Sequence, residues 1–209
     1  MFVKENDFNS VTMIGTMVET PVWSYRYKDE HFYIAHILIR RLSGVTDILP
    51  VTIPGHLLVK PFVLEGGERV ALKGQLRSYN RTTPQGGKLM LTIFVKEIYQ
   101  TQRGDDENRV ILRGTLCRTP VYRTTPLGRT ISDLLIAVNR AYHHADYLPT
   151  IAWGEGARMA AYWHVGTSLY LEGRFQSREY IKQEPEGSRP RVAYEVSASK
   201  LIVLSRSGE

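Results

Sequence analysis

The sequence has few features of a secreted, membrane-spanning or metal-binding protein. Among its 209 residues there is one cysteine, Cys117, which excludes an internal disulfide framework and any zinc site built on cysteines. No stretch approaches the roughly 20 apolar residues that a transmembrane helix needs, and the opening MFVKE lacks the pattern of a signal peptide. We therefore expect a cytoplasmic protein with no membrane association.

The residue patterns of an active site are also missing. No nucleophile–base arrangement, phosphate-binding glycine loop or paired-carboxylate motif is visible. His143 and His144 stand close to Asp146, but adjacent histidines in a loop point in divergent directions and no further ligand set recurs nearby. We therefore expect neither an enzyme nor a bound metal or cofactor.

Basic and aromatic residues are the features that the composition does offer. The 27 Lys and Arg exceed the 21 Asp and Glu, which gives a net charge of +6 and a pI near 9.4. This positive net charge favours a polyanionic partner, although many soluble domains without such a partner have a similar net charge. Twelve Tyr and three Trp provide flat rings that could stack on nucleobases or pack in a core.

The chain consists of two related halves at an offset of 99 residues. The segment that begins at Asn9, NSVTMIGTMVETPV, matches NRVILRGTLCRTPV, which begins at Asn108. The same offset aligns further identical pairs: Asp47 with Asp146, Gly74 with Gly173, and Ser78 with Ser177. One offset kept over such a length indicates a tandem duplication. We predict domains at residues 1–100 and 108–205, joined by a polar linker at residues 101–107 that limits their separation.

Alternating apolar residues predict five strands in each half. In the second half they fall at residues 110–116, 131–139, 147–153, 168–175 and 191–204, with a helix over residues 154–164. In the first half they fall at residues 11–17, 33–41, 47–53, 70–77 and 89–99, where Pro61 makes the corresponding helix short or absent. A helix between the third and fourth of five strands is the order of an OB-fold. The sequence predicts an all-β protein of two tandem OB-fold barrels, each a five-stranded Greek-key barrel, the second with a short helix.

A series of short motifs runs through the second half. They are Asn108–Leu112 with Gly114, Pro120, Pro126-x-Gly128, Ala137-Val138, Ala152-Trp153-Gly154, Tyr170-x-Glu172-Gly173-Arg174 and Tyr194-Glu195-Val196. Through these motifs residues 108–204 resemble the bacterial single-stranded DNA-binding (SSB) protein family, and the first half resembles it more weakly. The resemblance implies binding of single-stranded DNA without sequence specificity, in DNA replication, recombination or repair.

The resemblance also implies where bases would stack. Family members use a few aromatic side chains on strands two to five, and these positions fall here on Tyr142, Tyr147, Trp153 and Tyr180. In the first half the same offset gives Ser43, Ile48, Pro54 and Arg81, none of which is aromatic. Taken singly, each ring could equally be a core residue, although Trp153 beside Gly154 favours the surface. We therefore expect the second barrel to be the main binder.

Arginine residues could form the path for the phosphates, because guanidinium groups pair with phosphate oxygens and also stack on bases. We predict phosphate contacts from Arg123, Arg174 and Arg178, with Arg118, Arg129 and Arg140 as further candidates. The alternative is a solvated face that acidic neighbours balance. In the first half Arg40, Arg41, Arg77 and Arg81 could extend the path, with solvated surface as an equal alternative.

Two other functions use the same residues. The first is a primosomal or mobile-element replication accessory protein that acts mainly through protein–protein contacts, with a helicase or primase among its partners. The second is binding of RNA or structured nucleic acid. The family usually carries an acidic, hydrophobic tip at the end of a tail, whereas this sequence ends in SRSGE, which puts partner recruitment through such a tip in doubt. By analogy with the family we expect a nucleoid-associated homodimer that presents four OB-folds.

Overall fold

Two β-barrels built on one continuous sheet make up the computed structural model, which describes residues 8–59, 64–83, 86–102, 104–141, 144–184 and 187–204. The first barrel contains β1 (Phe8–Met17), β2 (Val22–Tyr27), β3 (Glu30–Arg40), β4 (Thr46–Pro54), β5 (Arg69–Thr83) and β6 (Gly86–Gln100). The second contains β7 (Glu107–Leu116), β8 (Val121–Thr124), β9 (Thr130–Asn139), β10 (Ala145–Trp153), β11 (Ser168–Glu184) and β12 (Gly187–Val203). The prediction of an all-β protein with two tandem OB-folds is confirmed.

The order of the strands in the sheet is β2-β3-β4-β6-β5-β1-β7-β11-β12-β10-β9-β8. Each half closes on itself through a second pairing, of β1 with β3 and of β7 with β9. Both closures need a glycine: a Cβ on Gly114 would lie 2.5 Å from the carbonyl oxygen of Ala137, and one on Gly15 would lie 2.5 Å from that of Leu38. The repeated glycine therefore lets the first strand of each barrel cross a neighbour at close range.

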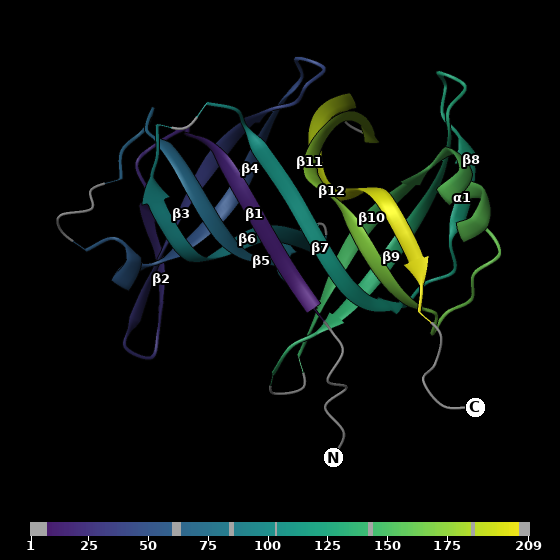
Figure 1. Cartoon of the computed structure of the whole chain (residues 1–209), viewed down its shortest axis with the longest axis horizontal. Helices are drawn as coiled ribbons and strands as arrows, with labels where there is room; N and C mark the ends of the chain where they lie inside the picture. The colour runs from purple at the N-terminus through teal and green to yellow at the C-terminus, as the bar shows by residue number, and fades with distance from the viewer. Residues whose placement is uncertain are drawn as a thin grey trace.

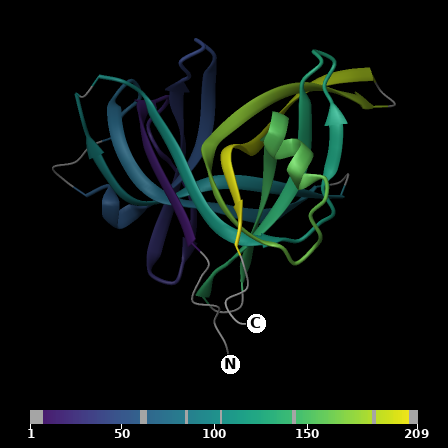
Figure 2. The ribbon, with the colours of Figure 1, turned by 45° about the vertical axis from the view of Figure 1, so that its right-hand side comes forward.

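Strands β1 and β7 join the two barrels (Figure 1). They pair antiparallel with Val11 opposite Val110, two residues that the 99-residue offset makes equivalent. The two barrels are thus related by an approximate twofold axis at this pair, and lie side by side in Figure 2. Alternate residues of β1 and β7 point into the cores, so that Val11, Met13, Val110 and Leu112 are fully buried.

A matching pair of carboxylates connects the barrels away from this axis, and these inter-barrel carboxylates are Asp47 and Asp146. Asp47 accepts the Ser177 backbone N–H at 2.8 Å and the Ser177 hydroxyl at 3.1 Å. Asp146 accepts the Ser78 backbone N–H at 2.7 Å. Both carboxylates are fully buried and ion-paired, Asp47 with Arg41 and Asp146 with Arg77 and Arg140. The Asp and Ser matches in the repeat therefore coincide with these contacts between barrels.

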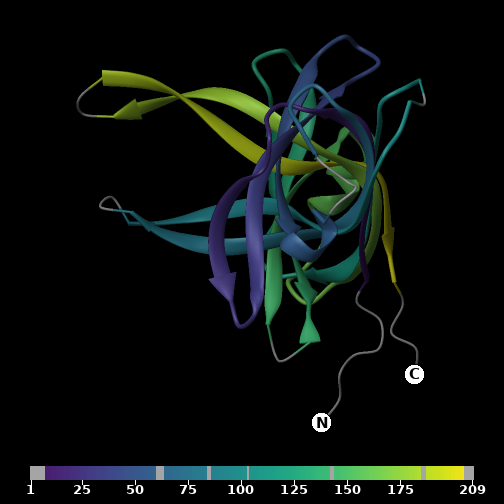
Figure 3. The same cartoon turned by 90° about the vertical axis from the view of Figure 1, so that its left-hand side faces the viewer.

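The observed elements differ from the predicted ones mainly in length. Strands β5 and β11 run well past their predicted ends, and β6 and β12 begin a few residues earlier than predicted. The two pairs form long hairpins that project to the same side of the molecule (Figure 3). The basic first loops contain the short strands β2 and β8, which were not predicted because their residues are mostly exposed and show no apolar alternation.

The helices are shorter than the sequence suggested. Helix α1 covers Gly154–Ala160, and the segment after it forms tight turns in which Trp163 N–H bonds to the Ala160 carbonyl at 3.1 Å. In the first barrel a 3-10 helix η1 (Gly55–Leu57) takes this place, while Pro61 lies outside the described residues.

Candidate nucleic-acid interface

The outer face of the second barrel collects most of the predicted site residues. On β10, Tyr147 and Trp153 alternate with the buried Leu148 and Ala152, and are 46% and 37% exposed. On β11, Arg174, Arg178 and Tyr180 share a face because they are spaced by even numbers of residues. The strand register brings the two sets together, since β12 pairs parallel with β10 at Ile151 and Ser197, and antiparallel with β11 at Ser197 and Arg174.

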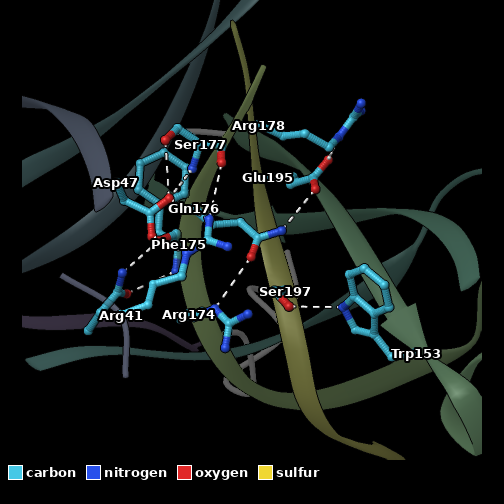
Figure 4. Close-up of polar contacts among 11 residues, drawn as sticks. Arg41, Asp47, Trp153, Arg174, Phe175, Gln176, Ser177, Arg178, Glu195 and Ser197 are labelled. Atoms are coloured by element: carbon cyan, nitrogen blue, oxygen red, sulfur yellow. Dashed lines mark hydrogen bonds and ion pairs between the residues drawn. The ribbon is translucent and has the colours of Figure 1, made fainter. Parts of the chain in front are cut away.

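The ring of Trp153 is held by its polar edge. The indole N–H donates a hydrogen bond of 2.9 Å to the Ser197 hydroxyl on β12, while part of the ring stays exposed (Figure 4). The strand ends directly after Trp153, because Gly154 has a positive φ of 54° and begins α1. A tryptophan fixed in this way presents a flat surface at a small cost in side-chain entropy when a ligand binds.

A groove of about 570 Å³ runs beside this tryptophan, and we call it the arginine groove. Four arginines line it: Arg41, Arg129, Arg174 and Arg178. Burial, and then the charge of Arg41, lower the pKa of the Arg174 guanidinium, so these cations lie in one another's field. Such a cluster favours an anion.

Acidic and amide side chains hold this groove in shape. The Glu195 carboxylate, 5% exposed, accepts the Gln176 side-chain N–H at 3.0 Å and forms an ion pair with Arg178 at 3.5 Å (Figure 4). Arg41 is fixed from the first barrel, because its guanidinium bonds to Asp47 and to the Ser177 carbonyl oxygen. The arginine groove is therefore built from both barrels.

A second hollow, the inter-barrel groove of about 380 Å³, lies between the β5–β6 hairpin and the second barrel. Lys88 and Met90 of β6 line one part of it, while Ile151 of β10, Tyr180 of β11 and Tyr194 of β12 line another. Tyr180 is 38% exposed and the Arg178 guanidinium lies 5.6 Å from the centre of its ring. A ring and a cation thus stand together next to the other barrel.

Other predicted residues are placed differently. Arg123 lies on the same face, but its guanidinium is bound by Asp133 at 2.6 and 3.1 Å, and this hydrogen bonding raises the pKa of Arg123. Arg140 pairs at 3.2 Å with Asp146, one of the inter-barrel carboxylates. Arg118 is exposed in the turn after β7 and is not among the residues that line the two grooves. Tyr142 lies outside the described residues. The DNA contacts of all these residues stay predictions.

The sequence indicated Arg41 as a residue of the first half that could extend the phosphate path, but not that it lines a groove together with arginines of the second barrel. Sequence reasoning missed Ser197 and Gln176, two polar residues that orient Trp153 and Glu195. The matched pairs Asp47–Asp146 and Ser78–Ser177 in the repeat were the only signal of contact between the halves.

Neither a metal-binding cluster nor a membrane-spanning helix is found in the described part of the chain. No group of three His, Cys, Asp or Glu residues gathers there as a metal site would require, with His143 outside that part. Across the described ranges no helix has the length and apolar character needed to cross a membrane. Burial raises the pKa of the Cys117 thiol, and its sulfur donates to the Leu135 carbonyl at 3.2 Å, as in a structural cysteine.

Comparison with known proteins gives the same result as the motifs. The family model of the single-strand binding protein family matches residues 107–204. A single-stranded DNA-binding protein 1 of Staphylococcus aureus is 36% identical over 84 residues, which cover 37% of this chain and 50% of the relative. A single-stranded DNA-binding protein of Bacillus cereus is 33% identical over 108 residues, which cover 48% of this chain and 62% of the relative. The chain thus spans about half to three fifths of the length of these relatives.

Among solved structures, the wild-type single-stranded DNA binding protein from Thermus aquaticus matches with a TM-score of 0.78 at 24% identity. This match covers 97% of the present chain and 96% of the Thermus chain, so the likeness in fold extends over both barrels. The family match thus concerns the second barrel, residues 107–204, while the Thermus structure shows that the fold of the whole chain is shared.

Proposed function

We propose that this protein is a non-enzymatic binder of single-stranded DNA that does not read its sequence. The observation that carries the proposal is the outer face of the second barrel, where exposed rings on β10 and β11 lie beside a groove lined by arginines. Tyr147, Trp153 and Tyr180 are 46%, 37% and 38% exposed, and the arginine groove lies beside Trp153. Binding of single strands needs these two features, because every base has a flat face and every nucleotide has a phosphate.

Each part of this face has a distinct task. A base would stack on Trp153, whose ring is already held by Ser197, and each such stack is worth about 1–3 kcal/mol. Arg174 and Arg178 lie on either side of Gln176 on β11 and would pair with successive phosphates. Neither contact depends on the identity of the base, which supports binding without sequence specificity.

The wider setting of this activity is also part of the proposal. We place it in DNA replication, recombination or repair, with the predicted unit at residues 108–205 as the main binder and the unit at residues 1–100 as its diverged copy. Two chains would assemble into a homodimer with four barrels, and a helicase or primase remains a proposed partner.

The test is the affinity of the full chain for a labelled oligothymidylate, measured by fluorescence anisotropy. The double variant Trp153→Ala/Tyr180→Ala removes two stacking surfaces, so we expect the affinity to fall by about 30-fold or more, which corresponds to about 1 kcal/mol per ring. Tyr162→Ala is the matched control, because Tyr162 is 82% exposed in the turns after α1. If both variants bind as wild type does, the proposed site is wrong.

A further inference from the structure

The first barrel has a surface of aromatic rings that the repeat alone does not reveal. Tyr25 on β2 stacks on Phe32 of β3, with ring centroids 4.8 Å apart and an angle of 14° between the planes. Phe32 in turn lies 5.9 Å from the ring of Phe94 on β6. The Arg77 guanidinium on β5 is placed over Phe94 at 5.8 Å. Three rings and a cation thus form a continuous row, the ring row, across four strands.

The outer members of this surface are open to solvent. Tyr25 is 44% exposed and Tyr79 on β5 is 53% exposed, whereas Phe32 below them is 8% exposed. Tyr79 and Arg77 share a face of β5 by their spacing of two residues. Burial, and next the nearby Tyr79, raise the pKa of the Tyr25 phenol, as expected for two phenols close to each other. Tyr25 and Tyr79 therefore present ring surface to solvent above the more deeply buried Phe32.

The register shows that this surface is the counterpart of the Trp153 site. Thr52 pairs with Phe94 in the first barrel, and its repeat equivalent Ile151 pairs with Ser197 in the second. Phe94 therefore occupies the position of Ser197, the residue that holds Trp153. The equivalent of Trp153 itself is Pro54, whose cross-strand partner is Phe32. The aromatic surface is kept at the same place in the barrel, but its rings come from neighbouring strands.

The ring row also leads toward the second barrel. Tyr79 pairs across β5 and β6 with Met90, and Arg81 on the same face pairs with Lys88. Met90 and Lys88 both line the inter-barrel groove, which contains Tyr180 of the second barrel. A strand of nucleic acid could pass along Tyr25 and Tyr79, past two cations, to Tyr180 without leaving the surface.

From these contacts we infer that the first barrel binds single-stranded nucleic acid itself, by stacking bases on Tyr25 and Tyr79 over the ring row. This inference rests on the proposed function and adds a second stacking site to it. The rings replace the aromatic set that the repeat does not supply at Ser43, Ile48, Pro54 and Arg81.

The test compares variants of the full chain by fluorescence anisotropy on a labelled oligothymidylate of about 30 nucleotides, long enough for two OB-folds. In Tyr25→Leu/Tyr79→Leu the leucine at position 25 still covers Phe32, and Tyr79→Ala alone serves as a second variant at an exposed position. Trp23→Leu is the matched control: Trp23 is 55% exposed on β2 but pairs with Tyr33, which puts it on the opposite face, where its N–H donates to His31.

The inference predicts that Tyr25→Leu/Tyr79→Leu lowers the affinity at least about fivefold and Tyr79→Ala lowers it in the same direction, while Trp23→Leu does not. If wild type binds, Trp153→Ala/Tyr180→Ala weakens binding and the first-barrel variants match the Trp23→Leu control, the first-barrel site is refuted and the proposed function stands. If wild type does not bind the oligonucleotide at all, both proposals fail.

Discussion

Replacing Asp47 by alanine should strongly destabilise the pair of barrels. Asp47 is fully buried and accepts hydrogen bonds from Ser177 across the barrel boundary, while two bonds of 2.7 and 2.6 Å join it to the Arg41 guanidinium. The variant would leave the half-buried Arg41 without its carboxylate and the Ser177 N–H without its acceptor. Removing one partner of a buried ion pair costs about 3–5 kcal/mol.

The predicted loss translates into a large shift in thermal unfolding. A chain of this size loses about 2–4 °C in midpoint for each kcal/mol, so Asp47→Ala should unfold about 6–20 °C below wild type in circular dichroism melts. Asp29→Ala is the control, because the Asp29–Arg26 pair is on the surface with the aspartate fully exposed, and its midpoint should stay close to that of wild type.

The same variant has an effect on binding that a purely local defect would not produce. Arg41 lines the arginine groove, so removal of its carboxylate partner adds net positive charge there. Below its melting temperature Asp47→Ala should therefore bind oligothymidylate with a steeper salt dependence. An unfolding midpoint equal to that of Asp29→Ala would refute the reasoning on the inter-barrel carboxylates.

Three further outcomes are expected. Arg174→Gln should reduce the slope of log affinity against log salt concentration by about 0.7, the value of one phosphate contact on a single strand, in anisotropy titrations at several salt concentrations; an unchanged slope would mean that Arg174 contacts no phosphate. Burial raises the pKa of Asp146 above its ordinary 3.8, so its protonation favours the folded state. The stability that this protonation contributes is fully present below pH 3.8 and is lost as the pH rises through the raised pKa. In urea unfolding, the free energy of unfolding of wild type should therefore increase relative to that of Asp146→Asn as the pH falls toward 3.8. A difference between the two that does not change with pH would contradict this. Light scattering at micromolar concentration should give the mass of two chains, and a monomer mass would count against the homodimer.

Most of the fold could be predicted because the chain repeats itself. Two weak strand patterns that agree at one offset are stronger evidence than either alone, and the repeat contains Gly15 and Gly114 at the places where the structure closes each barrel. The apolar alternation that predicted β1 and β7 reflects their burial, since every second residue from Asn9 and from Val110 onward is buried.

The site was harder to predict for two physical reasons. Contacts between barrels join residues far apart in the chain, as with Asp47 and Ser177, so no local pattern revealed that Arg41 lines the arginine groove. The base-stacking positions of the first half were also inferred only from the residues that the 99-residue offset makes equivalent to those of the second half. It therefore missed the ring row, where Phe94 stands in the place of Ser197.

Competition between single-stranded and duplex DNA tests the central claim most directly. The full chain is titrated with labelled oligothymidylate, and unlabelled single strand or duplex of equal length is then added. Stacking on Trp153 and Tyr180 needs unpaired bases, so the account predicts that the single strand displaces the label and that the duplex does so only at far higher concentration. Equal displacement by the two competitors, or no binding of the labelled strand, would contradict it.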